Sequence, residues 1–141
     1  MHFSVSHSAG LAVYVFGRRC QLGVDIEYLR PMPGASQIAA AFFSPSERSL
    51  LEALPVTDQQ KAFFYCWTRK EAFVKAIGEG LSYPLDRFDV SLHPEEPATL
   101  LRTPDHTGWF MTALAPASCW VGAMVTNKEG LRLVPHRWIP E

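Results

Sequence analysis

The sequence has no run of apolar residues long enough to cross a membrane. A membrane-spanning helix needs about 20 consecutive apolar residues, and the longest candidates here are interrupted by Arg, Asp or Gly within about ten. The N-terminal segment Met1–His7 also lacks the basic start and apolar core of a signal peptide. We therefore expect a cytoplasmic protein with no membrane segment.

An excess of either charge is missing as well. The 13 Lys and Arg residues and the 14 Asp and Glu residues give a formal net charge of −1. A protein that coats nucleic-acid phosphates normally carries a basic excess, so we do not expect nucleic acid as a partner. A small local basic site for a phosphorylated ligand is compatible with this balance.

Cysteine is scarce. The three cysteines, Cys20, Cys66 and Cys119, form no C-x-x-C pair. A disulfide between two of them would leave the third unpaired, so we expect reduced thiols, as is usual in the cytoplasm. The five histidines are scattered without an H-x-x-x-H spacing, which argues against a zinc site.

Apolar material for a core is plentiful. Hydrophobic residues make up 48% and aromatic residues 12% of the 141 residues. This length fits one domain, and the composition is typical of a folded one. We expect a single domain over residues 1–141.

Strand-like segments, rich in apolar residues and bounded by turn residues, lie towards both ends of the chain. The predicted strands are residues 3–6, 11–16, 21–27, 88–92, 109–115, 120–125 and 131–134. A connecting loop that contains Pro and Gly is predicted over residues 28–36.

The middle of the chain carries helix signals. Ser44–Glu47 is typical of a capping box with Pro45 in the first turn, and Pro55 ends this helix. A second box, Thr57–Gln60, precedes the longest helical pattern, whose apolar residues recur at steps of three and four as far as the natural stop Gly78. Helices between antiparallel strands predict an α+β fold, with an antiparallel sheet packed on the long helix.

Two acidic residues lie in the string Gly23–Glu27, G-V-D-I-E. Side chains alternate along a strand, so Asp25 and Glu27 point to the same face. Two adjacent carboxylates repel each other unless a cation lies between them, and their oxygens suit a hard divalent ion. Judged alone, this pattern is more often a solvated strand end.

A third acid lies in the long helix, within Trp67–Lys75, W-T-R-K-E-A-F-V-K. Glu71 and Lys75 are four residues apart and share a face, whereas Lys70 lies about 100° away from Glu71. One interpretation is a surface ion pair worth a few tenths of a kcal/mol, and this is favoured for the string alone. The other is a third carboxylate for the same ion, beside ammonium groups that contact phosphate.

Ser6–Ser8, S-H-S, lies where a predicted strand meets a turn. A histidine there could reach an anion while the hydroxyls donate hydrogen bonds. A hydrolytic triad of Ser6, His7 and Asp25 is disfavoured, because neighbours in a strand point to opposite sides and the G-x-S-x-G elbow is missing.

In this order the strings resemble a known family. Ser6–Ser8, Gly23–Glu27 and Trp67–Lys75, followed by Gly78–Leu81 and Pro84-Leu85, resemble a 4′-phosphopantetheinyl transferase of the Sfp type. The resemblance extends from residue 3 to about residue 92, and W-x-x-K-E-A-x-x-K with an upstream G-V-D-I-E is highly specific. It implies a 4′-phosphopantetheinyl transferase-like fold, as one half of the pseudo-two-fold Sfp arrangement.

Members of this family move the 4′-phosphopantetheine arm of coenzyme A onto a serine of an acyl, peptidyl or aryl carrier protein and release 3′,5′-ADP. The resemblance implies this transferase activity here, with coenzyme A and an apo-carrier protein as substrates. It also implies a Mg²⁺ cofactor held by Asp25, Glu27 and Glu71.

The resemblance further implies that Glu71, Lys75 and Lys70 are catalytic. Lys75 matches the lysine that contacts the coenzyme A phosphates, and Ser6 with His7 matches the phosphate-contacting pair. Lys70 is expected to orient Glu71 or to steady a phosphate. The carrier serine needs a base to take its proton, and either Glu71 or a metal-bound water is expected to serve.

One departure concerns the front of the chain, which begins almost at the S-H-S motif, whereas Sfp-type enzymes carry a further half before it. If the chain is complete, we expect a homo-oligomer, a dimer or a trimer, because apolar strands would be left exposed. The alternative function is a non-catalytic half-domain that binds coenzyme A or metal and acts as an interaction subunit.

Overall fold

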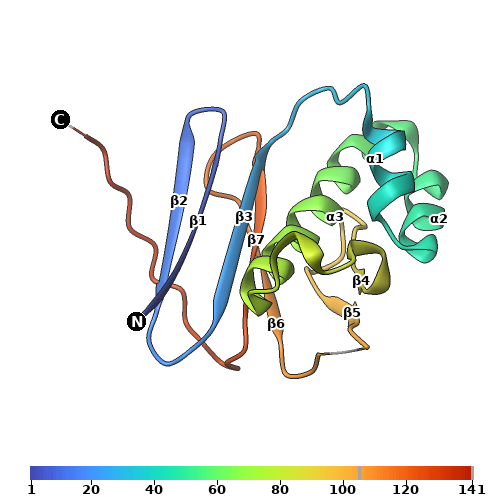
Figure 1. Cartoon of the computed structure of the whole chain (residues 1–141). Helices are drawn as coiled ribbons and strands as arrows, with labels where there is room; N and C mark the ends of the chain where they lie inside the picture. The colour runs from blue at the N-terminus through green and yellow to red at the C-terminus, as the bar shows by residue number, and fades with distance from the viewer. Residues whose placement is uncertain (105, 141) are drawn as a thin grey trace.

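A computed structural model of the chain describes residues 1–104 and 106–140. Strands surround a helical middle, which confirms the α+β class (Figure 1). The elements are β1 (His2–Ser8), β2 (Leu11–Gly17), β3 (Leu22–Tyr28), α1 (Ala35–Phe42), α2 (Pro45–Ala53), α3 (Val56–Ile77), β4 (Asp89–Val90), β5 (Leu100–Arg102), β6 (Phe110–Leu114) and β7 (Trp120–Thr126). Short 3₁₀ turns follow α3 at Gly80–Ser82 and Leu85–Arg87.

The central sheet has the strand order β3-β7-β6, and both of its pairings are antiparallel. In its register Asp25 lies opposite Ala123, and Glu27 lies opposite Val121. The strands β1 and β2 form a separate antiparallel hairpin beside β3, and β4 pairs with β5. Figure 1 shows α3 running beside this sheet, with α1 and α2 on the other side of α3.

The hydrophobic core lies between α3 and the central sheet and continues beneath α1 and the segment around β4. The predicted apolar stripe of α3 is confirmed, since Ala62, Cys66 and Phe73 are fully buried on it. Aromatic rings account for much of the contact, with Phe73 and Phe88 4.6 Å apart between centroids. This packing fixes α3 against β3, where the candidate site lies.

The helix ends follow the sequence signals in all but one case. At the start of α2, Glu47 N donates to Ser44 Oγ (3.2 Å), and Ser44 N donates to Glu47 Oε1 (2.8 Å), so the capping box is confirmed. Gly78 ends α3 with a φ of 74°, in the left-handed region that glycine adopts without strain. The predicted box at Thr57 is wrong, because α3 already begins at Val56 after Pro55, whose fixed φ suits the entry to a helix.

Other differences involve weak local signals. The predicted loop over 28–36 runs into α1 at Ala35, a helix without an acidic residue in its first turn or a side-chain cap at Gly34. The strand predicted at 131–134 is wrong: Leu131, Leu133 and Val134 lie exposed in an irregular segment, unpaired with any described strand. In the segment predicted as a strand at 88–92, only Asp89–Val90 forms one. None of the helices within the described residues is long and apolar enough to span a bilayer.

Candidate active site

The site begins with a close approach of two backbones. A Cβ added at Gly23 of β3 would collide with Ala72 O and Ala76 N, both backbone atoms of α3. Only glycine therefore lets β3 lie this close to α3. Because residues 23, 25 and 27 share one face of the strand, Asp25 and Glu27 also face the helix. The motif Gly23–Glu27 therefore supplies both the two acids and the glycine contact with α3 that directs their side chains towards the helix.

Asp25 is the most deeply buried acid of this group, with 8% of its surface exposed. Its Oδ1 accepts hydrogen bonds from Lys75 Nζ (3.2 Å) and from Ser6 Oγ (3.4 Å). Burial raises the pKa of Asp25 to about 7, although the nearby Lys75 ammonium acts to lower it. Repulsion from Glu71 and Glu27 adds to the rise, so these charges act on one another.

Glu71 and Glu27 complete an acidic cluster, which we define as Asp25, Glu27 and Glu71. Glu71 is half-buried, and burial raises its pKa, with Lys75 acting to lower it and Glu27 to raise it. Glu27 Oε2 accepts from Arg30 Nη1 (2.9 Å) and from Ser8 Oγ (3.1 Å). The structure therefore brings the three predicted metal ligands and Lys75 into one neighbourhood.

The cluster is not closed around a metal ion as it stands. Within residues 1–104 and 106–140, no three His, Cys, Asp or Glu side chains are arranged so that they could hold one. The ammonium of Lys75 and the guanidinium of Arg30 lie against Asp25 and Glu27 instead. The chemistry nevertheless fits a hard cation, because Asp25 Oδ2 is buried without a hydrogen-bond partner among the described residues and carboxylate oxygens are the ligands that Mg²⁺ prefers.

Lys75 is held by more than its acidic neighbour. Its Nζ also donates to the backbone oxygens of Val24 (2.9 Å) and Val5 (3.3 Å), so it has three acceptors for its three protons. About a third of the side chain, 35%, remains exposed. The predicted contact of Lys75 with a phosphate stays a prediction, and it requires the ammonium to release some of these acceptors.

The predicted phosphate pair, Ser6 and His7, is divided between the two faces of β1. Ser6 is buried; its hydroxyl accepts from Ile26 N (3.0 Å) and faces Asp25. His7 is exposed on the opposite face. The Ser6 hydroxyl is thus engaged with β3 and Asp25, while the His7 side chain is exposed; the phosphate contact of each stays a prediction.

Lys70 is the predicted catalytic residue that the structure places elsewhere. It is fully buried, and its ammonium lies 2.8 Å from Glu47 Oε1. The same group donates to the carbonyls of Leu85 and Phe88. A step of one residue along α3 turns the side chain by about 100°, which directs Lys70 into the core and away from the acidic cluster. Direct contact with a substrate phosphate is therefore incompatible with its position.

Sequence reasoning missed several residues that shape this site. The sequence places Gly23 in a motif but does not show its contact with α3, and it does not show the bonds of Ser4 and Ser8 to β3. The signal that could have found the serines is their spacing: Ser4, Ser6 and Ser8 occupy every second position of one strand and so share a face.

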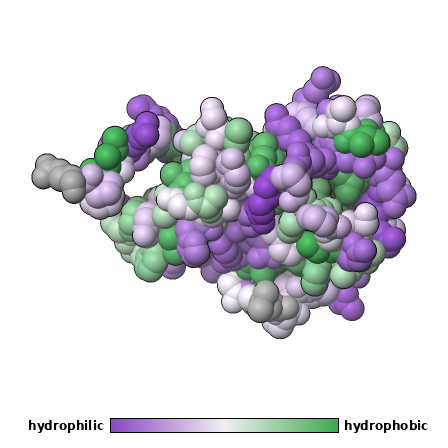
Figure 2. Space-filling view, turned by 90° about the horizontal axis from the view of Figure 1, so that it is seen from above, coloured by the Kyte–Doolittle hydropathy of each residue, from purple (hydrophilic) through white to green (hydrophobic). Residues whose placement is uncertain are grey.

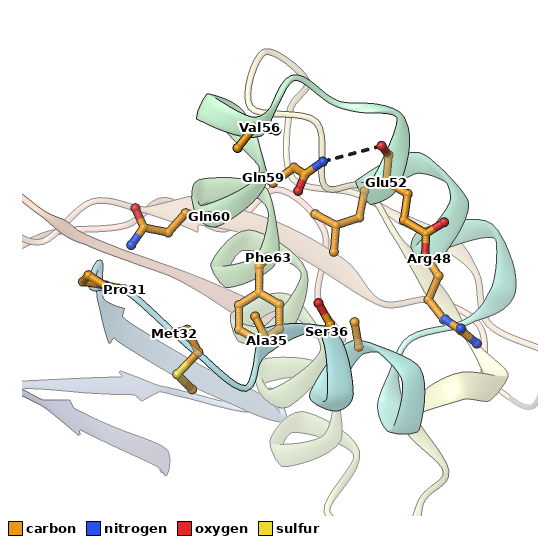
Figure 3. A pocket seen from close by; sticks show the side chains of 12 residues that line it. Pro31, Met32, Ala35, Ser36, Arg48, Glu52, Val56, Gln59, Gln60 and Phe63 are labelled. Carbon is orange, nitrogen blue, oxygen red and sulfur yellow. Dashed lines mark hydrogen bonds between the residues drawn. The ribbon is translucent and has the colours of Figure 1, made fainter.

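A cavity of about 340 Å³ opens between α1, α2 and α3 (Figure 3). Figure 3 shows Phe63 of α3 between the loop that carries Met32 and the polar side chains of α2. The residues that line this cavity include no member of the acidic cluster. A smaller hollow, also lined by Met32 and Phe63, extends to Glu27 and Arg30, which places that end of the cluster near the helical side of the molecule.

Sequence comparison relates the chain to enzymes of known activity. The family profile of the 4′-phosphopantetheinyl transferase superfamily matches residues 21–121. The chain is 40% identical over 136 residues to the 4′-phosphopantetheinyl transferase HetI of a Nostoc species, a match that covers 96% of this chain and 55% of HetI. It is 40% identical over 94 residues to the 4′-phosphopantetheinyl transferase Sfp of Bacillus subtilis, covering 67% of this chain and 41% of Sfp. The chain thus spans about half the length of these curated relatives.

Comparison with solved structures supports the fold. A holo-(acyl-carrier-protein) synthase from Bacillus anthracis, in complex with CoA (3′,5′-ADP), matches with a TM-score of 0.59 at 19% identity, over 75% of this chain and 93% of the other. The corresponding synthase of Thermotoga maritima matches with a TM-score of 0.55 at 19% identity, over 75% of this chain and 61% of the other.

Proposed function

The chain belongs to the 4′-phosphopantetheinyl transferase superfamily, and from this premise we propose that it transfers the 4′-phosphopantetheine group of coenzyme A to a serine of an apo-carrier protein, with Mg²⁺ as cofactor. The observation that carries the proposal is the convergence of Asp25, Glu27 and Glu71 beside Lys75. An acyl, peptidyl or aryl carrier protein is the expected acceptor, and 3′,5′-ADP is the expected second product.

The acidic cluster would hold the cation through carboxylate oxygens, including the buried Oδ2 of Asp25. When bound, Mg²⁺ would offset the negative charge of the pyrophosphate. Lys75 and the exposed His7 bind the phosphate groups in this proposal, for which Lys75 moves away from Asp25 Oδ1. Arg30 keeps Glu27 in place from the solvent side.

In the transfer step, the serine Oγ of the carrier forms a bond to the β-phosphorus of coenzyme A. The bond from that phosphorus to the bridging oxygen breaks, and its electron pair leaves with 3′,5′-ADP. The Glu71 carboxylate takes the proton of the serine hydroxyl. A metal-bound water is the alternative base, because a carboxylate that held Mg²⁺ would be a weaker base than a free one.

Incubation with coenzyme A, Mg²⁺ and several apo-carrier proteins tests this proposal by mass spectrometry. The carrier should gain the mass of the 4′-phosphopantetheine group. Glu71→Gln should abolish the gain, whereas the matched control Glu129→Gln, which changes an exposed acid outside the site, should leave it unchanged. Absence of transfer to every carrier tested, by protein that binds coenzyme A, would overturn the assignment of the reaction.

A second candidate function is a non-catalytic half-domain that binds coenzyme A or metal and is completed by another polypeptide. The observation that favours it is the coverage of the relatives, since the matched region is 55% of HetI and 41% of Sfp. Calorimetric titration with coenzyme A separates the candidates: binding without transfer supports the half-domain, and transfer by the chain alone rejects it.

If the chain is complete, self-association to a dimer or trimer is a further part of the proposal. The outward face of the β1–β2 hairpin exposes Phe3 (67%), Tyr14 (62%) and Phe16 (63%), a concentration of aromatic surface that is unusual for a monomer. Figure 2 shows apolar residues at the surface on the side of the molecule where the hairpin lies in Figure 1. Light scattering over a range of concentrations tests this, and a monomer throughout would reject it.

We assign the reaction to the cytoplasm. All three cysteines, Cys20, Cys66 and Cys119, are free, and reduced thiols are usual in that compartment. Fractionation of cells that express the protein would test the assignment, and recovery outside the cytoplasmic fraction would reject it.

A further inference from the structure

The hairpin is attached to β3 through side chains. One edge of β3 pairs with β7, and the other edge faces β1, whose serine hydroxyls accept hydrogen bonds from the β3 backbone. Lys75 Nζ adds bonds to Val24 O and Val5 O across the same junction. We call this junction the β1–β3 seam. Its hydroxyl bonds are Val24 N to Ser4 Oγ (3.1 Å), Ile26 N to Ser6 Oγ (3.0 Å) and Tyr28 N to Ser8 Oγ (3.1 Å).

Two of these hydroxyls have a second partner. Ser8 Oγ donates its proton to Glu27 Oε2 (3.1 Å), and Ser6 Oγ donates to Asp25 Oδ1 over a longer distance (3.4 Å). A serine hydroxyl has one proton to donate and can accept at the same time, so both bonds are made by one group. A hydroxyl that accepts from an amide is polarised and donates more strongly, and a carboxylate acceptor strengthens the bond further.

Each acid is held in this way through one oxygen. On Glu27, Ser8 and Arg30 both contact Oε2. On Asp25, Ser6 and Lys75 both contact Oδ1, and Oδ2 is left buried without a hydrogen-bond partner among the described residues. The seam therefore holds one oxygen of each carboxylate and leaves Asp25 Oδ2 without a hydrogen-bond partner among the described residues.

We propose that Ser8, and more weakly Ser6, are positioning residues that orient Glu27 and Asp25 for a divalent cation, so that docking of the hairpin and alignment of the acids are a single event. This inference rests on the proposed function, and it gives Ser6 a different part from the phosphate contact that the family resemblance implies. Ser8 carries the larger share because its bond is the shorter one.

Ser4 supplies a matched control within the same strand. It makes the same bond to a β3 amide, at the same distance as Ser8, and it makes no bond to a carboxylate among the described residues. Loss of the Ser4 hydroxyl weakens the seam alone, whereas loss of the Ser8 hydroxyl weakens the seam and leaves Glu27 held by Arg30 alone. A comparison of Ser4→Ala with Ser8→Ala therefore separates attachment of the hairpin from orientation of the acid.

The test measures amide hydrogen exchange and Mg²⁺ affinity on the full chain. Ser4→Ala should speed exchange at Val24, and Ser8→Ala should speed it at Tyr28 to a similar degree. Calorimetry with Mg²⁺ alone should then show an affinity loss of about tenfold for Ser8→Ala, the scale seen for partners that orient metal ligands, and less than about twofold for Ser4→Ala. The apparent KM for Mg²⁺ in the transfer assay should rise in parallel, with a smaller change in kcat.

A second pair of variants separates loss of the hydroxyl from a general loss of folding. Ser8→Thr keeps the hydroxyl and should retain Mg²⁺ affinity, whereas Ser8→Val has a similar shape without the hydroxyl and should lose it. If Ser4→Ala lowers affinity as much as Ser8→Ala, if Ser8→Val matches Ser8→Thr, or if the wild-type chain binds no Mg²⁺, the positioning role is wrong. Failure of transfer to all carriers, with these affinity differences intact, would overturn the proposed reaction and leave the positioning role standing.

Discussion

The ammonium of Lys75 lies 3.2 Å from Oδ1 of Asp25 and is anchored there by the carbonyls of Val24 and Val5. A cation at this distance favours the ionised carboxylate. Burial outweighs it, however, because the pKa of Asp25 still rises to about 7. When ionised, the three carboxylates of the acidic cluster outnumber the two cations that contact them, Lys75 and Arg30, and a divalent ion would neutralise the remaining negative charge.

Asp25 makes stability depend on pH between about 4 and 7. In this window the unfolded chain has released the Asp25 proton and the folded chain retains it, so each rise in pH favours the unfolded state. The contribution of Asp25 is complete below pH 4, falls by at most about 1.4 kcal/mol per pH unit, and is lost above pH 7. Burial is the main cause of the raised pKa of Asp25; Lys75 acts to lower this pKa, and Glu71 and Glu27 act to raise it.

Urea unfolding of metal-free protein at several pH values checks the prediction, with Asp25→Asn as reference. The difference in free energy of unfolding, wild type minus variant, should decrease from pH 4 to pH 7 and then level off. A difference that increases with pH would mean that Asp25 is ionised in the folded state throughout.

Removal of the Lys75 ammonium should raise the pKa of Asp25 further. In Lys75→Met the side chain keeps its length but loses the charge and the hydrogen bond that lower this pKa. The Asp25 carboxyl carbon, followed by NMR, should titrate above pH 7 in the variant. Lys128→Met, a change at an exposed position outside the site, is the control and should leave the titration unchanged. An unchanged or lower pKa in Lys75→Met would contradict the observed contact.

Much of this arrangement could be predicted from local sequence, and the exceptions have physical causes. Alternation along β3 and the four-residue step from Glu71 to Lys75 fix directions within single elements, whereas the grouping of the three acids around one ion was implied by the family resemblance. The partner of Lys70 could not be predicted in this way, because Glu47 belongs to α2 and the two residues meet only when α2 packs near α3. The serine bonds of the seam likewise join β1 to β3 through tertiary contact.

The same reason accounts for the errors in secondary structure. The capping box at Ser44 is a local interaction and was predicted correctly. A strand needs a partner, and the apolar residues at 131–134 have none among the described strands. The short helix α1 lacks acids in its first turn and depends on packing against α3, with Ala39 buried.

Gly23→Ala should damage both stability and the site. The new methyl group would meet backbone atoms of α3, at Ala72 and Ala76, which cannot turn aside as a flexible side chain could. Overpacking of this kind typically costs about 1–3 kcal/mol, and more where the backbone must shift. Separation of β3 from α3 would also move Asp25 and Glu27 away from Glu71, so Mg²⁺ affinity should fall in the fraction that folds.

Gly34→Ala is the matched control for that substitution. A Cβ at Gly34 meets nothing within 4 Å, and its φ of −93° suits any residue. Thermal unfolding followed by circular dichroism should show a lower Tm for Gly23→Ala and little change for Gly34→Ala. Equal Tm values would mean that the β3–α3 contact is looser than its geometry indicates.

The buried pair of Lys70 and Glu47 should prove to be a requirement for folding. Lys70→Met leaves an unpaired carboxylate in the core, a change that typically costs about 3–5 kcal/mol, and Glu47→Gln alone strands the ammonium in the same way. The double variant removes both charges and should recover part of the loss. Recovery should be incomplete, because the carbonyls of Leu85 and Phe88 still lack their donor.

Urea unfolding of the wild type, the two single variants and the double variant gives the coupling energy between Lys70 and Glu47, and the transfer assay is normalised to folded protein. If Lys70→Met were as stable as the wild type but inactive, Lys70 would act in the chemistry after all.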